Sequence, residues 1–179
     1  FNHLVVNLME GKVVGWFQGR FEWGPRALGN RSILADPRRA DMKHIVNSKI
    51  KFREPFRPFA PVILEEQAGE FFTGLFDFKR QYPARYMLLV LPWKGSAGEV
   101  IPAVNHLGTG RLQTLRREWN PRYYRLVEKF GEATGVPVLM NTSFNLRGEP
   151  IVASPANAWN TFSKSGIDLL VLGRFLVSK

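Results

Sequence analysis

The stretch from Gly19 to Pro37 reads GRFEWGPRALGNRSILADP, and it combines three glycines with three arginines directly after a short apolar run. That run, Val13 to Phe17, is rich in β-branched and aromatic residues, which predicts a strand ending at Gly19. Gly24 and Gly29 permit tight turns that bring main-chain N–H groups close to a ligand. The stretch therefore predicts a strand that runs out into a glycine-rich, anion-binding loop.

Three arginines of this stretch, Arg20, Arg26 and Arg31, are the first candidate ligand-binding residues. An arginine stays charged at any physiological pH, and its planar fork of N–H donors matches phosphate or carboxylate oxygens two at a time. A surface turn with solvated arginines is the simpler alternative. The repeated combination of arginine with glycine favours a phosphate or carboxylate site.

Composition describes a globular chain of 179 residues, 45% hydrophobic, which we expect to form a single domain spanning 1–179. Lys and Arg total 25 against 15 for Asp and Glu, so the expected partner is a nucleotide, a phosphate metabolite or a nucleic acid. The chain opens at Phe1 inside an amphipathic stretch, so we expect a fragment of a longer protein.

Cysteine is absent, which excludes disulfides, thiol catalysis and cysteine metal sites, and which agrees with a cytoplasmic protein. His3, His44 and His106 are far apart, so we expect no histidine metal centre in this chain. No window has the roughly 18 apolar residues that a membrane span needs, so we expect no membrane partner.

A second basic cluster lies in residues 49–66, KIKFREPFRPFAPVILEE. Its cations alternate with apolar residues, and its prolines forbid a helix, which predicts an extended segment with cations on one side. The alternative is a solvated Lys/Arg edge above a Phe-lined core. The cations are Lys49, Lys51, Arg53 and Arg57, and the apolar residues are Ile50, Phe52, Phe56 and Phe59.

The remaining chain alternates predicted helices and strands, which indicates an α/β sheet. The short spacing between Met87 and Leu115 adds an antiparallel part. Helices are predicted at Asp41–Ile50, Glu65–Phe72, Pro121–Thr134 and from Pro155 to Gly166; strands at Val62–Leu64, Met87–Trp93, Val100–Val104, Val136–Met140, Leu169–Leu172 and Phe175–Val177; a turn at Lys94–Gly98; and a surface connection at Thr73–Pro83.

Two further loops carry polar groups. HLGTGRLQT, residues 106–114, presents Arg111 and Gln113 beside two glycines, although a simple hairpin turn would read similarly. NTSFNLRGEP, residues 141–150, clusters short donors and acceptors after a buried strand, the position at which α/β sheets bind ligands. Ordinary turn chemistry of Asn and Ser remains an alternative for part of this second loop.

GRFEWGPRALGNRSILADP, KFREPFRPFAP and PVLMNTSFNLRGEPIV, in this order, resemble the C-terminal domain of the O-carbamoyltransferases that modify nodulation factors and aminoglycoside or cephalosporin-type antibiotics. The resemblance runs from about Val13 to Val177. It implies a YrdC-like fold, similar to threonylcarbamoyl-adenylate synthase, with a twisted mixed β-sheet flanked by helices. It also implies formation of carbamoyl-adenylate from carbamoyl phosphate and ATP, while a separate N-terminal domain with a histidine metal site carbamoylates the acceptor hydroxyl.

The resemblance also implies roles for individual residues. Lys51/Arg53 and Ser143/Asn145 match the Lys-x-Arg and Ser-x-Asn pairs of the synthase. The family commonly reads H-x-D-G-T-x-R in the third loop, whereas HLGTGR here is one residue shorter and lacks the acid. The expected catalytic residues are Lys51, Arg57, Ser143 and Asn145, and the expected binding residues are Arg20, Arg26, Arg53, His106, Arg111, Asn141 and Arg147.

Adenylation by attack of a carbamate oxygen on the α-phosphate needs fixed positive charge more than acid or base catalysis. Mg²⁺ is expected on the triphosphate, and Glu22, Asp36 and Glu149 are unranked candidates for contacting it. Two alternatives stay open: a domain that only docks on a partner, and a nucleic-acid-binding module. The second rests on aromatic residues interleaved with arginines at residues 117–125.

Overall fold

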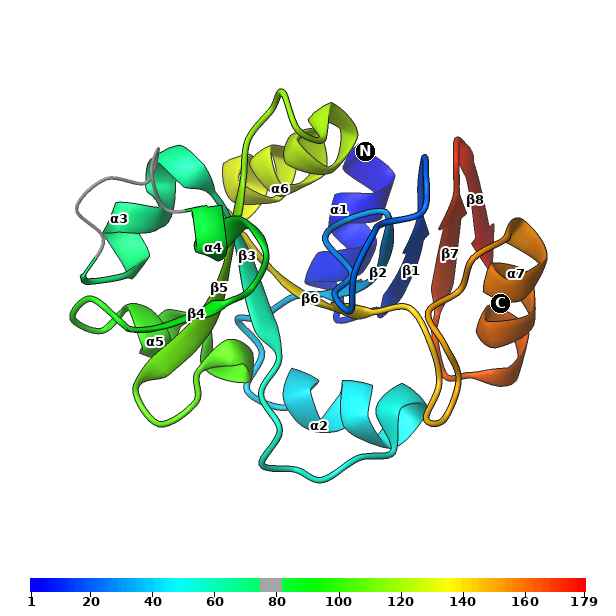
Figure 1. Ribbon diagram of the computed structural model, residues 1–179, viewed down its shortest axis with the longest axis horizontal. Helices are drawn as coiled ribbons and strands as arrows, with labels where there is room; N and C mark the ends of the chain where they lie inside the picture. The colour runs from blue at the N-terminus through cyan, green and yellow to red at the C-terminus, as the bar shows by residue number, and fades with distance from the viewer. Residues whose placement is uncertain (75–81) are drawn as a thin grey trace.

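A computed structural model describes residues 1–74 and 82–179 (Figure 1). Its elements, with η for 3₁₀ or π helices, are α1 (Asn2–Met9), β1 (Val14–Phe17), β2 (Arg31–Ala35), α2 (Met42–Val46), η1 (Asn47–Lys51), β3 (Ala60–Leu64), η2 (Glu65–Gln67), α3 (Ala68–Phe71), α4 (Tyr82–Arg85), β4 (Leu89–Pro92), α5 (Ala97–Val100), η4 (Pro102–Val104), β5 (Thr109–Leu115), α6 (Pro121–Thr134), β6 (Val138–Ser143), α7 (Pro155–Lys164), β7 (Leu169–Leu172) and β8 (Phe175–Ser178).

The described strands form one mixed, eight-stranded sheet in the order β4-β5-β3-β6-β2-β1-β7-β8. β1 pairs with β7 and β3 with β5 in parallel, and the other neighbouring pairs are antiparallel. β3 therefore separates β5 from β6. Because side chains alternate along a strand, the odd-numbered residues of β5 and β6 can meet above β3 on one face.

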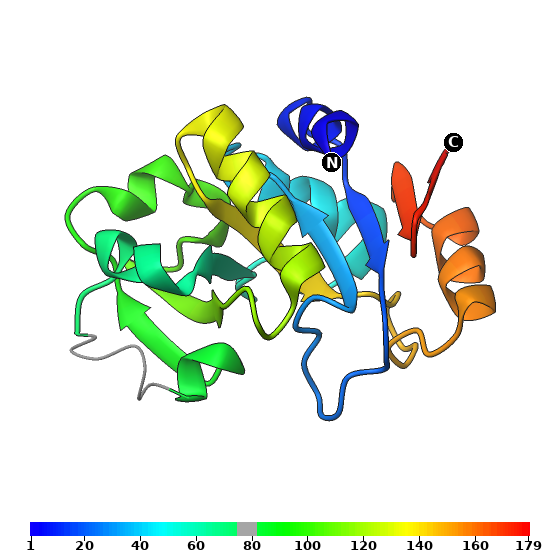
Figure 2. The same cartoon turned by 90° about the horizontal axis from the view of Figure 1, so that it is seen from above.

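Helices cover both faces of this sheet. α1 and α6 lie on one face, where their apolar residues pack with Leu34, Val62 and Leu139 of the sheet (Figures 1 and 2). α2 and α7 contribute to the core on the other face, which includes Ile63 and Met140. The two cores confirm the expected α/β architecture of a sheet flanked by helices.

α6 forms as its sequence predicts. The side-chain oxygen of Asn120 accepts a hydrogen bond from the N–H of Tyr123 (3.1 Å), and Gly135 ends the helix with φ 74°. The start of α6 also shapes the Gly/Arg loop, defined as residues 19–30. Gly29 has φ 117°, and a Cβ there would lie 2.1 Å from the Tyr123 ring, so no side chain fits.

The segment after α2 is not the extended, alternating run that its sequence predicts. The π-helix η1 ends at Phe52, which takes the left-handed conformation with φ 45°. The widened turn carries Lys51 inward, to 6% exposure, while the rings of Phe52 and Phe56 are exposed. The prediction failed because acceptors distant in the sequence bind Lys51 and compensate its burial.

Other predicted elements differ from the structure in type or in extent. Val100–Val104 is not a strand but part of α5 and η4, and α5 also replaces the end of the turn predicted at Lys94–Gly98. Asn141, Thr142 and Ser143 belong to strand β6 rather than to a loop, because β2 extends far enough to pair with them. Most of the connection predicted at Thr73–Pro83 lies outside the described residues.

Candidate active site

Lys51 joins the two sequence pairs that the resemblance singled out. Its ammonium group donates to the carbonyl oxygen (2.5 Å) and hydroxyl (3.2 Å) of Ser143. It also donates to the carbonyl oxygen (3.1 Å) and the side-chain Oδ1 (2.9 Å) of Asn145. The π-turn of η1 and the end of β6 thus meet around one buried ammonium group.

The pKa of Lys51 is lowered from 10.5 to about 7. Burial is the largest cause, because it penalises the charged form, and the positive charges of Arg53 and Arg57 add to it. With a pKa of about 7, the Lys51 side chain can gain or lose its proton at physiological pH. An anion beside it would favour the charged form and raise the pKa again.

Lys51 belongs to a group of five basic residues, which we call the cation cluster. Its members come from the Gly/Arg loop, η1, the segment after η1, and β5. They are Arg26, Lys51, Arg53, Arg57 and Arg111.

Mutual repulsion within the cation cluster is visible in the pKa values. Burial, and then the charges of Arg57 and Arg111, lower the pKa of Arg53 to about 10. The pKa of Arg111 is lowered by burial and by the charges of Arg26 and Arg57. Like charges held this close favour the binding of a polyanion, which would relieve the repulsion.

Two arginines of the cation cluster retain unused donors. Among the described residues, the Nε atoms of Arg26 and Arg111 are buried without a hydrogen-bond partner. Arg53, by contrast, is held in place: its Nε donates to Asn47 (3.2 Å) and its guanidinium stacks on Phe59 (4.3 Å). Arg26 and Arg111 thus each keep one Nε–H donor that no described residue accepts.

Two buried amides, Gln113 and Asn141, bond one another and the Gly/Arg loop. Asn141 Nδ2 donates to the carbonyl oxygen of Ala27 (3.1 Å) and to Gln113 Oε1 (2.6 Å). Gln113 Nε2 donates in turn to the carbonyl oxygen of Leu28 (2.9 Å). These contacts tie the Gly/Arg loop to β5 and β6 across the face of β3.

The Gly/Arg loop is braced from inside by Glu22, whose carboxylate accepts main-chain N–H groups of Leu28 (2.9 Å), Asn30 (3.1 Å) and Arg31 (3.2 Å). Burial raises the pKa of Glu22, although these hydrogen bonds and the charge of Arg31 act in the opposite direction. Glu22 is thus a structural carboxylate.

Arg31, predicted as an anion ligand, has a different role. Its guanidinium is buried and donates to the carbonyl oxygens of Gln18 (2.5 Å), Asn30 (2.9 Å) and Gly19 (3.2 Å). The prediction was wrong because Arg31 begins strand β2, where its side chain turns back onto the loop.

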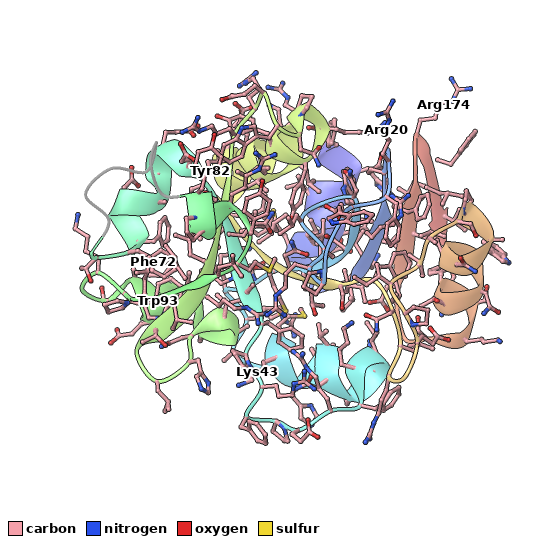
Figure 3. All side chains as sticks on the ribbon, in the orientation of Figure 1. Arg20, Lys43, Phe72, Tyr82, Trp93 and Arg174 are labelled. Atoms are coloured by element: carbon pink, nitrogen blue, oxygen red, sulfur yellow. The ribbon has the colours of Figure 1, made fainter. Side chains whose placement is uncertain are left out.

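Three predicted binding residues, Arg20, Arg147 and His106, are not members of the cation cluster. Figure 3 shows Arg20 projecting outward on the side of Arg174, opposite Lys43. Arg147 is engaged with the carbonyl oxygen of Phe52 (3.0 Å) at the protein surface. His106 lies in the turn before β5, and no hydrogen bond found among the described residues involves its imidazole.

The carboxylates considered for Mg²⁺ are occupied by protein partners. Asp36 pairs with Arg38 (2.6 Å), and Glu149 accepts from the N–H of Leu146 (3.2 Å) and the hydroxyl of Thr161 (3.3 Å). Within residues 1–74 and 82–179, no group of three or more His, Asp or Glu residues could hold a metal ion.

The aromatic residues of α6 do not form a surface on which nucleic-acid bases could stack. Tyr123 and Tyr124 are buried, and Arg117 and Arg125 pair with Glu128 at 2.7 Å each. Of the interleaved aromatic and basic residues at 117–125, those at 117–119 lie in the turn before α6 and those from 121 onward form the first turns of α6, which packs on the sheet. None of the helices in the described part of the chain is long and apolar enough to cross a bilayer.

Some residues of this site were missed from the sequence. Gln113 was seen only as part of a loop, and Glu22 only as a possible metal contact. For Gln113 a signal existed, since Arg111 and Gln113 are two residues apart and share a face if the segment is a strand. For Glu22 no local signal exists, because its partners are main-chain N–H groups.

Comparison with known proteins gives the family. Residues 5–179 match the model of the carbamoyltransferase C-terminus family. The chain is 50% identical over 173 residues to nodulation protein NolO of Bradyrhizobium diazoefficiens, covering 96% of this chain and 31% of that protein. It is 41% identical over 167 residues to a 3'-hydroxymethylcephem-O-carbamoyltransferase of Amycolatopsis lactamdurans, and the match covers 93% of this chain and 30% of that protein. The chain thus spans under a third of these relatives.

Among solved structures, full-length HypF in its phosphate- and nucleotide-bound form matches with a TM-score of 0.62 at 15% identity, over 95% of this chain and 20% of HypF. This likeness concerns the fold, and it confirms the expected YrdC-like α/β sheet. The family match extends over nearly all of the described strands and helices. The chain belongs to the carbamoyltransferase C-terminus family.

Proposed function

We propose that this domain binds ATP and carbamoyl phosphate and forms carbamoyl-adenylate. Water first cleaves carbamoyl phosphate to carbamate and inorganic phosphate. A carbamate oxygen then attacks the α-phosphorus of ATP, the bond between the α-phosphorus and the bridging oxygen breaks, and pyrophosphate leaves. The cation cluster, gathered around the contact of Lys51 with Ser143 and Asn145, is the observation that carries this proposal.

The charge of the cation cluster suits two phosphorylated substrates. The cation cluster holds five basic residues. The carboxylate of Glu54 offsets part of this charge, because it pairs with exposed Arg57 at 3.7 Å and acts to raise the pKa of Arg53. Phosphate oxygens bound here replace repulsion with charge-assisted hydrogen bonds. Donors fixed before the reaction stabilise the charge that moves onto the leaving pyrophosphate.

Lys51 and its acceptors suit the α-phosphate. In the ligand-free protein the ammonium group is shared among four oxygen atoms of Ser143 and Asn145. The Ser143 hydroxyl also donates to Asn145 Oδ1 (2.6 Å), so these two side chains stay paired if a phosphate oxygen takes over one donor of Lys51. Lys51 and the Ser143 hydroxyl would then donate hydrogen bonds to the α-phosphate as negative charge develops on it in the transition state.

Family membership supports transfer of the carbamoyl group as the purpose of this activation. The relatives are about three times longer than this chain, which leaves room for a second, N-terminal domain that binds the acceptor. We expect this chain to activate the carbamoyl group and the other domain to transfer it. ATP brings Mg²⁺ on its phosphates, so the ion is expected with the nucleotide.

The test is to incubate the chain with ATP and carbamoyl phosphate and to measure pyrophosphate and AMP derivatives. We expect pyrophosphate only when both substrates are present, and no carbamoylated alcohol without the rest of the longer protein. If the protein at its full natural length released pyrophosphate independently of carbamoyl phosphate, that result would contradict the proposal. Carbamoylated acceptor made by this chain alone would contradict the division of labour.

A further inference from the structure

The connection between α7 and β7, residues 165–168, contacts the π-turn that carries Lys51. The main-chain N–H of Gly166 donates to the carbonyl oxygen of Lys49 (3.1 Å). The Lys49 ammonium group also pairs with Asp168 (3.7 Å), and Asp168 accepts the N–H of Val13, the residue before β1 (2.8 Å). η1 is thus tied to this end of the sheet two residues before Lys51.

The contact uses an acceptor that a longer helix would need. In an α-helix the carbonyl oxygen of Lys49 would accept the N–H of Arg53, four residues later. Here the Gly166 N–H takes that place, and the helical segment of α2 and η1 ends at Lys51. Phe52 then has φ 45°, a left-handed conformation that a bulky residue keeps only where surrounding contacts hold it. The contact with Gly166 is one of those that hold this turn.

The approach is possible because Gly166 has no side chain. A Cβ at Gly166 would lie 2.6 Å from the Cβ of Lys49, 3.0 Å from its Cγ and 3.2 Å from its Cδ. The first of these distances is shorter than van der Waals contact allows. Gly166 is not among the glycines with a positive φ, so close packing, rather than backbone conformation, requires glycine at this position.

We propose that Gly166 is a positioning residue for Lys51: by packing against Lys49 it holds the π-turn that directs the Lys51 ammonium group toward the end of β6. This role concerns the protein without ligand and goes beyond the proposed function. Only its effect on ATP affinity rests on that function. A larger residue at Gly166 would push η1 away from the connection and withdraw Lys51 from its acceptors on β6.

The surroundings of Lys51 provide a measure of its position. Burial is the largest cause of its lowered pKa, and the charges of Arg53 and Arg57 act in the same direction. Its acceptors from β6 are uncharged. The other charged residues of η1, of the loop after β6 and of the α7–β7 connection are Lys49, Arg147, Glu149 and Asp168. Withdrawal of η1 would expose the Lys51 ammonium group to water, and its pKa would rise.

The experiment measures how acetylation of Lys51 by acetic anhydride depends on pH, with mass spectrometry of the labelled peptide, on the ligand-free protein at its full natural length. Only the neutral amine reacts, so the pH of half-maximal labelling reports the pKa. We expect a midpoint at about pH 7 in the wild type. Gly166→Ala should raise the midpoint by about one pH unit or more.

Gly131→Ala is the matched control for crowding. Its added methyl would lie 2.7 Å from the Cβ of Pro137, on α6, which covers the opposite face of the sheet from α2. It should keep the wild-type midpoint. Lys49→Gly removes the three atoms that a methyl at Gly166 would meet. Adding Gly166→Ala to Lys49→Gly should therefore shift the midpoint little, whereas the same change in the wild type shifts it fully.

Melting temperatures establish that each variant folds. A folded Gly166→Ala protein with the wild-type midpoint would overturn the inference, and so would an equal shift in Gly131→Ala. Hydrogen exchange at the Gly166 amide of the wild type gives a test that needs no variant. We expect slow exchange at this amide, and exchange as fast as in an unfolded chain would show that the contact with Lys49 does not hold the turn.

Nucleotide binding separates this inference from the proposed function. If Lys51 contacts ATP, Gly166→Ala should weaken ATP binding at about pH 7 by about tenfold or more, and Gly131→Ala should not. A raised midpoint with unchanged ATP affinity would support the role of Gly166 and contradict the contact between Lys51 and ATP. Weaker ATP binding with an unchanged midpoint would overturn the role of Gly166 and leave the proposed function standing.

Discussion

The ammonium group of Lys51 donates to both the carbonyl oxygen and the hydroxyl oxygen of Ser143, at 2.5 and 3.2 Å, although the two residues are 92 positions apart. The contact exists because a π-turn carries Lys51 inward and β6 ends beside it. It places a lysine of shifted pKa at the centre of the cation cluster. The first prediction concerns proton uptake by the Lys51 amine.

ATP binding should take up a proton at Lys51. Its pKa is about 7 in the free protein, so at about pH 8 the amine is mostly neutral. A bound phosphate raises the pKa and restores the charge, so uptake should approach one proton and affinity should fall as the pH rises above about 7. Calorimetry in buffers of different ionisation enthalpy measures this uptake.

Lys51→Met provides the comparison for proton uptake, because ATP carries a titrating phosphate of its own. The variant should show only the uptake that belongs to the nucleotide, and its affinity should depend less on pH. Identical proton uptake by the wild type and Lys51→Met would show that Lys51 does not titrate on binding.

Arg57→Ala should weaken ATP binding while stabilising the free protein. The loss of one charge-assisted contact corresponds to about 1.5–3 kcal/mol of binding free energy. The same change relieves the repulsion that lowers the pKa values of Lys51, Arg53 and Arg111, so the melting temperature without ligand should not fall. Nucleotide titration and thermal unfolding measure the two effects.

Arg174→Ala is the control for charge, since Arg174 projects away from the site near the C-terminal strand (Figure 3). It removes the same formal charge and should leave ATP affinity almost unchanged at physiological salt. Equal loss of affinity in the two variants would mean that net charge, rather than the cation cluster, attracts the nucleotide.

Ser143→Ala and Asn145→Ala should differ in their effect on stability. The Asn145 amide donates to the carbonyl oxygens of Leu146 (3.0 Å) and Glu149 (2.8 Å), so its loss should lower the free energy of unfolding by about 1–3 kcal/mol. The Ser143 hydroxyl instead has side-chain partners: it donates to Asn145 Oδ1 (2.6 Å) and accepts from Lys51 (3.2 Å). Its removal should slow pyrophosphate release about ten- to a thousandfold with little change in unfolding.

Denaturant unfolding and single-turnover pyrophosphate release together separate these roles. A Ser143→Ala protein with wild-type release would remove the hydroxyl from the mechanism. Asn145→Ala with unchanged stability would show that the loop after β6 does not depend on its amide.

Local signals explain which parts of the fold could be predicted. α6 was predicted with its correct ends, because Asn120, Pro121 and Gly135 act within a few residues of the helix. The inward turn of Lys51 was not predictable, since its acceptors lie on β6 and the local alternation favoured an extended path.

The candidate site was predictable as a set of residues but not as an arrangement. Lys51, Ser143 and Asn145 were expected to act together, and the structure places them in contact. The hydrogen bond between Gln113 and Asn141 depends on the sheet order β5-β3-β6, which no short stretch of sequence specifies. Arg31 was misassigned because a buried arginine that binds carbonyl groups reads like one that binds phosphate.

Glu22→Ala should damage both stability and ATP binding. Two main-chain N–H groups of the Gly/Arg loop and that of Arg31, the first residue of β2, would lose their acceptor, at a cost of about 1–3 kcal/mol for each buried donor that water does not reach. The loop that carries Arg26 would then be less ordered. Melting temperature and nucleotide affinity should fall together.

Glu132→Ala, on the exposed side of α6, should change neither quantity appreciably. If Glu22→Ala melted like the wild type, the brace would contribute no stability. If it melted lower but bound ATP normally, Arg26 would not depend on the loop.

Exchange of labelled pyrophosphate into ATP is the most direct measurement, because it reports reversible formation of an adenylate and needs no acceptor. On the protein at full natural length, we predict exchange that requires a carbamoyl donor, that falls at least about tenfold in Ser143→Ala, and that is almost lost in Lys51→Ala. Exchange without any carbamoyl donor, or undiminished exchange in Lys51→Ala, would contradict the account.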